Sequence, residues 1–437
     1  MGQWCDRVRQ VKITDRMQKA TRQQIKSHNS TLVLRTIFEH AVISRATVSR
    51  VTNLSRATVS DVVAELLEEG LVAEVGQGIS EGGKPPTLLS IVDDSMHLIC
   101  IDAAGEDQLQ GAVINLRGQI RRRHFLPLAN GRGDGALEVL YQLIADLLAM
   151  TDRPVLGIGV GAPGLVDTGQ GRVVYAVNLE WYDLPLATLL RKRFDLPVHV
   201  ANDANAAALG EFIFGSHAAS RRHRDGKSNG HADSPGAMTE TRSLALANVV
   251  VLLAGRGIRA GIVMNGKLHL GDYFGAGEIG HLVVEPEGKR CVCGNVGCLE
   301  TVASTVALQH RAQVVLTRSH NTAAGAAVAG EPWTTDELLA LHAGGDQSVA
   351  TLLAQSGAAI GIAAASLVTV LNVERIVVAG SLARFGEGLL APLRTAMAQR
   401  ALPLLAERTT VTLSELGADI VILGTAALLL NQELGLV

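Results

Sequence analysis

The spacing of apolar residues changes along this chain of 437 residues and separates an N-terminal part from a longer body. Between residues 27 and 75, apolar side chains recur at the three- and four-residue intervals of one buried helix face. From residue 97 onward, short apolar runs of strand length alternate with longer helical patterns. Alternation of strands and helices on this scale predicts an α/β body with two lobes.

The N-terminal part is predicted to contain three helices followed by two strands. Helices are expected around residues 32–38, at 44–52 and at 55–70, and strands at 71–75 and 87–92. Ser55 is suited to cap the third helix, and Gly70 to end it. This order of elements is typical of a winged helix-turn-helix, here over residues 27–92. The polar, basic residues 1–26 are expected to form a poorly ordered tail or a loose helix.

The body is predicted as a long succession of strands and helices. Strands are expected at residues 97–103, 110–115, 121–126, 155–160, 198–201, 246–253, 258–264, 375–379 and 420–423. Helices are expected at 135–151, 183–194, 204–215 and 425–434, and they dominate 301–371. Residues 216–243 are rich in Ser, Arg, His, Gly and Asp, which predicts a disordered insertion. No run reaches about 20 uninterrupted apolar residues, so no membrane partner is expected.

Charge is distributed unevenly and indicates a partner for the N-terminal part. Residues 1–60 contain eleven Lys/Arg against three Asp/Glu, a balance of +8, so the remainder carries about −11 of the total of −3. A basic end on an acidic body favours binding of a polyanion. The expected DNA contacts are the small, hydroxylated and basic residues at the start of the third helix, with two flanking cations: Ser55, Arg56, Ala57, Thr58, Ser60, Arg45 and Lys84 of the wing. The alternative is a helical protein–protein module with a basic surface.

Three of the five cysteines lie within eight residues and predict a metal site. Cys291, Cys293 and Cys298 follow His281, and three thiols with one imidazole form a complete tetrahedral ligand set for zinc. Four protein ligands leave no open position for substrate, so the expected Zn²⁺ is structural. A disulfide is the weaker interpretation, because no secretory signal is evident and a reducing, cytoplasmic compartment is expected. A loop with incidental cysteines is the remaining alternative.

Several motifs together resemble those of the ROK (repressor, open reading frame, kinase) family, in its transcriptional regulator branch. The resemblance covers nearly all of residues 27–437. Its most specific segments are Leu54–Ser60, Gly82–Pro86, Gly161–Gly164, Asn202–Asn205, Gly277–His281 and Cys291–Glu300. It implies a two-lobed actin/hexokinase-like α/β body, with residues 93–203 and 421–437 in a small lobe and 204–420 in a large one.

The resemblance also implies a sugar pocket supported by the zinc site. Asn202 and Asp203 follow a predicted strand, where ligands of α/β proteins usually bind. In ROK kinases the residue matching Asp203 is the general base, and residues matching Glu278, His281 and Glu300 contact sugar hydroxyls. His281 would then serve both metal and sugar.

The expected phosphate loops differ from those of ROK kinases. A kinase of this family has an Asp-x-Gly-Gly-Thr-Lys type of loop, whereas this chain has Asp102-Ala-Ala-Gly-Glu-Asp107. The second loop, Gly255-Arg-Gly-Ile-Arg259, also departs from Gly-Thr-Gly-Ile-Gly. Carboxylates would repel the phosphates of ATP, so kinase activity is not expected.

The sequence therefore predicts a DNA-binding regulator of sugar metabolism, of the repressor type. It is expected to form a homodimer or higher homo-oligomer, with operator DNA and a sugar or sugar derivative as partners. Two alternatives remain: a ROK sugar kinase with an additional DNA-binding module, and a regulator that responds to a protein partner instead of a sugar.

Overall fold

The computed structural model describes residues 22–79, 85–105, 107–128, 131–215, 248–319 and 332–436. Within it the chain divides into two compact units, and the division falls between Ile91 and Val92. The predicted insertion at 216–243 lies outside the described residues, as do Lys84, Glu106 and most of the predicted tail.

The N-terminal unit has the predicted helices and wing strands. Its elements are α1 (Arg22–His40), β1 (Ile43–Ser44), α2 (Arg45–Thr52), α3 (Arg56–Glu68), β2 (Val72–Gln77) and β3 (Thr87–Ile91). The strands form one antiparallel sheet in the order β1-β3-β2. Val33, Ile37, Val48 and Val59 are fully buried where the helices meet. The winged helix-turn-helix prediction is confirmed, and its first helix begins earlier than residue 27.

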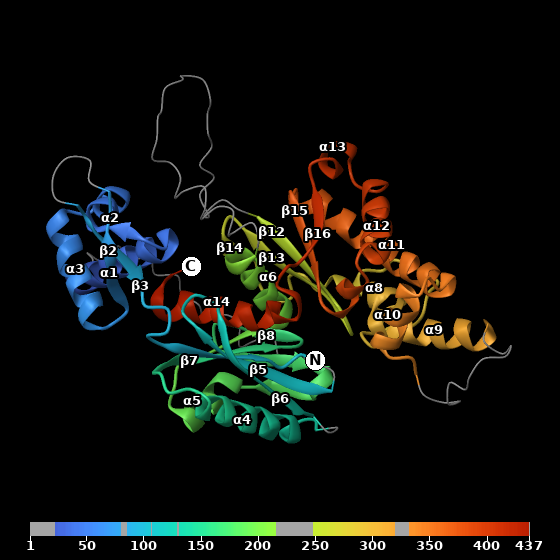
Figure 1. The fold of residues 1–437 in the computed structure, drawn as a ribbon. Helices are drawn as coiled ribbons and strands as arrows, with labels where there is room; N and C mark the ends of the chain where they lie inside the picture. The colour runs from blue at the N-terminus through green and yellow to red at the C-terminus, as the bar shows by residue number, and fades with distance from the viewer. Residues whose placement is uncertain are drawn as a thin grey trace, which may run out of the picture. The chain divides into compact units, whose positions relative to one another are not determined.

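The body contains two five-stranded sheets that repeat one arrangement (Figure 1). The first contains β4 (His97–Asp102), β5 (Gln108–Asn115), β6 (Ile120–Pro127), β7 (Val155–Ala162) and β11 (Val198–Asn202). The second contains β12 (Val249–Ala254), β13 (Ile258–Met264), β14 (Lys267–Leu268), β15 (Arg375–Ala379) and β16 (Thr410–Leu413). In each, three consecutive strands form an antiparallel meander and two later strands add in parallel. The repeat confirms the two-lobed α/β prediction.

Helices α6 (Asp203–Phe214) and α14 (Ile420–Leu434) pack against each other between the two sheets (Figure 1). Helix α6 contacts β12 and β13, and α14 contacts β4 and β7. Glycine is required at their crossing, because a Cβ atom on Gly424 would lie 1.8 Å from the carbonyl oxygen of Ala206. The crossing therefore joins the two lobes through one buried apolar layer.

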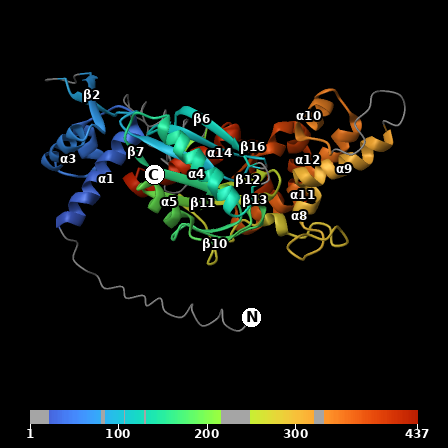
Figure 2. The ribbon, with the colours of Figure 1, turned by 90° about the horizontal axis from the view of Figure 1, so that it is seen from below.

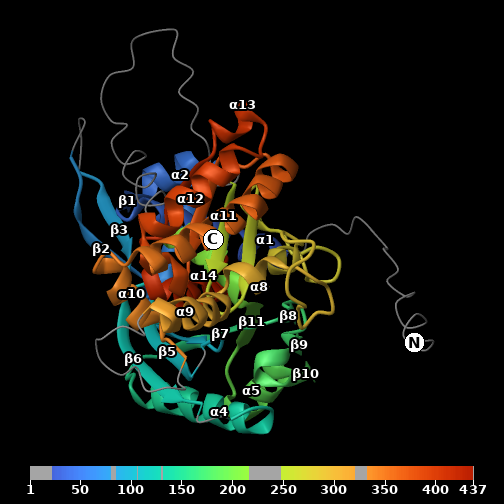
Figure 3. The same cartoon turned by 90° about the vertical axis from the view of Figure 1, so that its right-hand side faces the viewer.

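The remaining helices cover the outer faces of the sheets. Helices α4 (Asp134–Ala149) and α5 (Leu186–Phe194) pack on the first sheet (Figure 2). The second lobe contains α8 (Leu299–Ala303), α9 (Thr305–Ser319), α10 (Thr335–Ala343), α11 (Gln347–Leu371), α12 (Glu387–Ala398) and α13 (Pro403–Ala406) (Figure 3). The described part of the body also contains the 3₁₀ segments η1 (Val177–Leu179), η3 (Ile279–His281), η4 (Ser381–Phe385) and η5 (Gly417–Asp419). Each core is made almost entirely of aliphatic side chains.

Some details of the body differ from the sequence prediction. The strand expected at 420–423 is wrong, because these residues are the first turn of α14. They are buried on every side, and periodicity cannot distinguish a short buried strand from a buried helix. The helix expected from residue 183 begins at Leu186, because Asp183 belongs to a small sheet. That sheet, unpredicted, contains β8 (Leu165–Asp167), β9 (Arg172–Ala176) and β10 (Trp181–Leu184).

Two helical segments of the body are long and apolar enough to cross a membrane by length and composition alone. They are Gln347–Leu371 and Gly417–Leu434, and 61% of the most apolar window of each is buried inside the protein. Burial of this kind is typical of the core helices of a globular body, so the two segments are weak evidence for a membrane span.

Candidate functional site

Two carboxylates meet where parallel strands of the first sheet end. Strands β4 and β11 both run parallel to β7, so their carboxyl ends lie at one edge of the sheet. Asp102 is the last residue of β4, and Asp203 follows the end of β11 as the first residue of α6. Both are buried, with 8% of Asp102 and none of Asp203 exposed. This edge is the usual ligand position in α/β sheets.

An arginine from the second lobe contacts the second of these acids, Asp203. Arg259 of β13 donates from Nη2 to Oδ2 of Asp203, and only 16% of its side chain is exposed. Glu300 and Arg259 both lie close to Gly257: a Cβ atom added to this glycine would be 2.9 Å from Oε2 of Glu300 and 3.1 Å from Nη1 of Arg259. Burial by itself would lower the pKa of Arg259, but the charges of Asp203, Glu278 and Glu300 raise it overall. We call Asp102, Asp203, Glu278 and Glu300 the carboxylate cluster.

Asn202 organises the backbone beside Asp203. Its Nδ2 donates to the carbonyl of Gly164 at 2.8 Å, and its Oδ1 accepts from the backbone amides of Ala204 and Asn205. The side chain therefore caps α6 and fixes the Gly161–Gly164 turn against it. Its predicted contact with sugar stays a prediction.

Asp102 is held in surroundings that disfavour its charge. Burial raises its pKa from 3.8 to about 6, although hydrogen bonds from the Gln110 side chain and the Ala104 amide lower it. The charge of Asp203 raises this pKa further and that of Arg259 lowers it, which places Asp102 within the field of the cluster. Burial likewise raises the pKa of Glu278, with Arg259 acting against it.

Asp102→Asn is expected to stabilise the body at pH 8 by about 1–3 kcal/mol, because each unit of pKa shift is worth about 1.4 kcal/mol. The folded pKa of about 6 exceeds the ordinary 3.8, so wild-type stability falls as pH rises through this window. The stability of the variant should lack this fall with rising pH, and at pH 4 the variant should be no more stable than the wild type. Urea unfolding followed by fluorescence measures it, because Trp181 and Trp333 belong to the body.

Asp152→Asn is the matched control, since its side chain is 90% exposed. Its difference from wild type should be flat between pH 4 and pH 8. A flat difference for Asp102→Asn as well would contradict the assignment of a raised pKa to that carboxyl.

The predicted metal ligands converge in the second lobe. One ligand atom from each of His281, Cys291, Cys293 and Cys298 lies within 4.8 Å of the others. Sγ of Cys293 and Cys298 are 3.6 Å apart, and Sγ of Cys291 is 3.7 Å from Nδ1 of His281. Tetrahedral zinc with bonds of about 2.3 Å places its sulfur ligands about 3.8 Å apart. The group can hold a metal ion, and its donor set fits zinc.

Tight backbone turns bring these ligands together. Gly297 has φ +75°, and a Cβ atom there would lie 1.5 Å from the carbonyl oxygen of Glu285, so only glycine fits. Leu299 then donates to the carbonyl of Leu282, which joins α8 to the segment after η3. This contact fixes Glu300, which lies on α8 just after the ligand Cys298. Glu278 lies immediately before η3, the segment that contains the ligand His281.

The predicted DNA contacts lie on the N-terminal unit. Ser55, Arg56, Ala57 and Ser60 are exposed, and Thr58 is half-buried. Ser55 caps α3 by accepting from the amide of Thr58 at 3.1 Å, as its sequence position indicates. Arg45 instead forms an ion pair of 2.8 Å with Glu74 of β2.

Arg259 is the residue whose role in the site sequence reasoning missed. From the sequence, Arg259 indicated only that the second phosphate loop lacks the last glycine of the kinase pattern Gly-Thr-Gly-Ile-Gly. Strand β12 pairs with β13 so that Arg259 lies opposite Leu253, and in this register the guanidinium of Arg259 forms a hydrogen bond with Asp203. Asp102 had a usable signal, because it lies near the end of the strand predicted at 97–103, and Asn202 likewise follows the strand predicted at 198–201.

Comparisons with known proteins identify the family of the chain. The family model described as "ROK family" matches residues 98–222 and 236–432. A xylose repressor of Caldicellulosiruptor bescii is 30% identical over 414 residues, which are 94% of this chain and 97% of that protein. The crystal structure of a ROK family transcriptional regulator, a homologue of Escherichia coli MLC, has a TM-score of 0.75 at 26% identity and covers 94% of this chain and 98% of its own.

A kinase of the same fold covers less of the chain. The ROK family glucokinase of Streptomyces griseus, solved with glucose and AMPPNP, has a TM-score of 0.61 at 25% identity. It covers 76% of this chain and 98% of its own, whereas the two regulators extend over 94% of this chain. By the extent of the family match and of these full-length relatives, the chain belongs to the ROK family.

Proposed function

We propose that this chain is a sugar-responsive transcriptional repressor. Its N-terminal unit binds operator DNA, and its body binds a sugar that changes DNA affinity. The observation that carries the proposal is the match to a xylose repressor and to a ROK family transcriptional regulator, each over 94% of the chain, which is too long a match to omit the winged helix-turn-helix. A ligand can act in this way when it has different affinities for two states of the protein.

The charge of the site favours an uncharged sugar over a sugar phosphate. Three carboxylates, Asp203, Glu278 and Glu300, surround one guanidinium, and Asp102 adds part of a fourth charge near neutral pH. A phosphate would meet a net negative site, and like charges at ~4 Å cost about 1 kcal/mol in water and more in a buried site. Hydroxyl groups can donate to these carboxylates instead.

Arg259 also argues against a kinase. The residue at the position of the kinase base, Asp203, is fully buried and pairs with Arg259. A base engaged in a buried ion pair cannot readily accept the proton of a sugar hydroxyl. The chain is therefore a regulator rather than an enzyme, in agreement with its repressor relatives.

The His281, Cys291, Cys293 and Cys298 group is proposed to hold a structural Zn²⁺. Nδ1 of His281 faces the thiol of Cys291, which leaves Nε2 for a sugar hydroxyl. When bound, the ion supplies rigidity, because it fixes the segments that carry Glu278 and Glu300. The protein is further proposed to act in the cytoplasm as a homodimer on a two-fold operator.

Arg56→Ala is expected to weaken binding to the chain's own promoter about tenfold and to reduce the salt slope by about one, because one phosphate or base contact is lost. Mobility shifts across a salt series measure both. Arg122→Ala is the control, since it removes an equal charge from the exposed surface of β6. Equal effects of the two variants would contradict a DNA-binding role for α3.

The complex of the chain with its own promoter also tests whether a sugar is the effector. Xylose or glucose is expected to release the DNA and to raise the melting temperature, whereas glucose 6-phosphate should not release the DNA. A regulator that responds only to a protein partner would ignore every sugar. Release of ADP from ATP and sugar, abolished by Asp203→Asn, would instead support the kinase alternative.

A further inference from the structure

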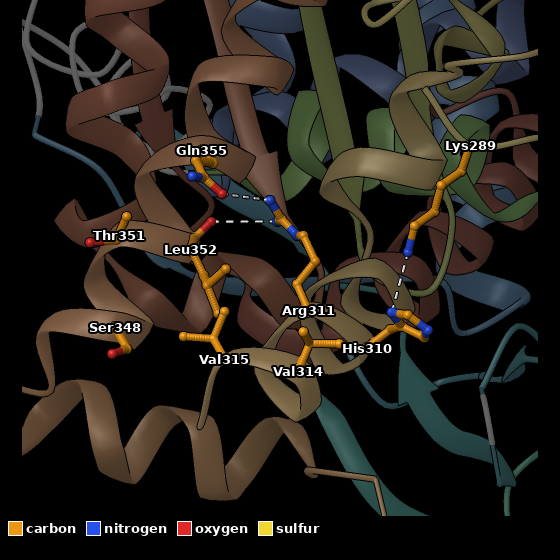
Figure 4. A pocket seen from close by; sticks show the side chains of 9 residues that line it. All are labelled: Lys289, His310, Arg311, Val314, Val315, Ser348, Thr351, Leu352 and Gln355. Atoms are coloured by element: carbon orange, nitrogen blue, oxygen red, sulfur yellow. Dashed lines mark hydrogen bonds between the residues drawn. The ribbon is translucent and has the colours of Figure 1, made fainter. Parts of the chain in front are cut away.

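A cavity lies in the second lobe between α9 and α11, and none of its lining residues belongs to the carboxylate cluster or the metal ligands (Figure 4). Its volume is about 520 Å³, which is within the range of small-molecule sites. Val314 and Leu352 give it an aliphatic wall. The charged side chains that line it are all basic, although the body as a whole is acidic.

Arg311 is the central cation of this cavity. Its guanidinium donates to Oε1 of Gln355 at 3.0 Å and to Oγ of Ser356 at 2.6 Å, and both partners are neutral. Its Nε is buried with no hydrogen-bond partner among the described residues. Burial lowers the pKa of Arg311, and the charge of Glu285 only partly offsets this effect. A half-buried guanidinium with no carboxylate in hydrogen-bond contact is costly, and an unpaired buried donor such as its Nε calls for an explanation.

Two further basic residues line the cavity on another side. Nζ of Lys289 lies 3.2 Å from Nδ1 of His310, to which it can donate a hydrogen bond. In Figure 4 this pair lies on one side of the cavity, and the hydrogen bonds of Arg311 to Gln355 and Leu352 lie on another side. Ser348 and Thr351 add hydroxyl groups along α11. The lining thus offers donors from three elements: the metal-binding loop, α9 and α11.

We propose that this cavity binds a small organic phosphate, with its phosphate group held by Arg311 and Lys289 and its apolar part against Val314 and Leu352. The planar guanidinium suits the paired oxygens of a phosphate, and charge-assisted hydrogen bonds are stronger than the neutral ones that Arg311 now makes. The phosphate would supply the missing counter-charge.

The position of Lys289 gives the site a consequence for the rest of the lobe. Lys289 precedes Cys291 by two residues, and its carbonyl accepts from the amide of Gly297 at 2.8 Å. A ligand that fixes Lys289 would therefore stabilise the loop that carries the metal ligands. This site is separate from the sugar pocket, so the proposal does not depend on the proposed function.

Isothermal titration of the full chain with phenyl phosphate tests the proposal. One saturable site per chain is expected, with inorganic phosphate competing for it. Lys289→Met and Arg311→Met should each weaken binding about tenfold, the value of one charged hydrogen bond. Lys289 is exposed, so its variant remains informative if Arg311→Met fails to fold. Arg122→Met, at an exposed arginine that bonds a backbone carbonyl, should bind as wild type does.

Three outcomes would overturn the proposal. The first is the absence of saturable binding up to about 10 mM phenyl phosphate, because a dissociation constant above this concentration is too weak for a specific binding site. The second is equal binding by all variants, which would place the phosphate elsewhere, such as on the basic N-terminal unit. The third is benzoate binding as tightly as phenyl phosphate, which would assign the cavity to carboxylates instead.

Discussion

Cys293→Ser is expected to abolish metal binding and to lower the free energy of unfolding of the body by about 5 kcal/mol, in the range of lost metal sites. Cys293 is the exposed member of the ligand set, so its replacement leaves no cavity in the core. Its Sγ lies 3.6 Å from that of Cys298, which makes it one corner of the proposed tetrahedron. Metal analysis and urea unfolding provide the two measurements.

A chelator gives the matched control for this variant. It should lower the stability of the wild type to that of Cys293→Ser and leave the variant unchanged, because the variant has no metal to lose. Cys100→Ser should keep one zinc per chain, since Cys100 is buried in β4, away from the ligand set. Full zinc content in Cys293→Ser would show that these residues are not the ligands.

Arg259→Met is expected to destabilise the body by about 3 kcal/mol at pH 8. Breaking a buried ion pair leaves an uncompensated charge, here on Asp203, which is fully buried. The loss should be smaller at pH 5, because an unpaired buried carboxyl can take up a proton there. Urea unfolding followed by tryptophan fluorescence at both values measures the effect.

Asp203→Asn in the Arg259→Met background should restore most of the lost stability, because no buried charge then remains unpaired. The comparison pair is Arg123 with Asp419, whose side chains are 42% and 24% exposed. Arg123→Met should cost less than about 1 kcal/mol, as exposed ion pairs do. A similar small cost for Arg259→Met would mean that Arg259 does not hold the cluster together.

Much of the fold could be read from local patterns. Ser55 caps α3 as predicted, and the apolar stripe of α3 is buried through Val59, Val62 and Val63. The short strand β16 (Thr410–Leu413) was missed, because only Val411 of its four residues is buried and no alternation is visible. Residues 420–423 were assigned to a strand because β-branched runs favour strands, yet they lie in a helix that two sheets enclose.

The metal ligand set and the winged helix-turn-helix were determined by the sequence alone, because their residues are close in the chain and backbone turns such as that at Gly297 bring them together. The pairing of Arg259 with Asp203 was decided only by the tertiary structure. The two residues are 56 positions apart and come from different elements, and they meet because β13 packs against α6. Local spacing carries no information about such a contact, since it depends on how two independently formed elements are brought together by the buried layer between the lobes.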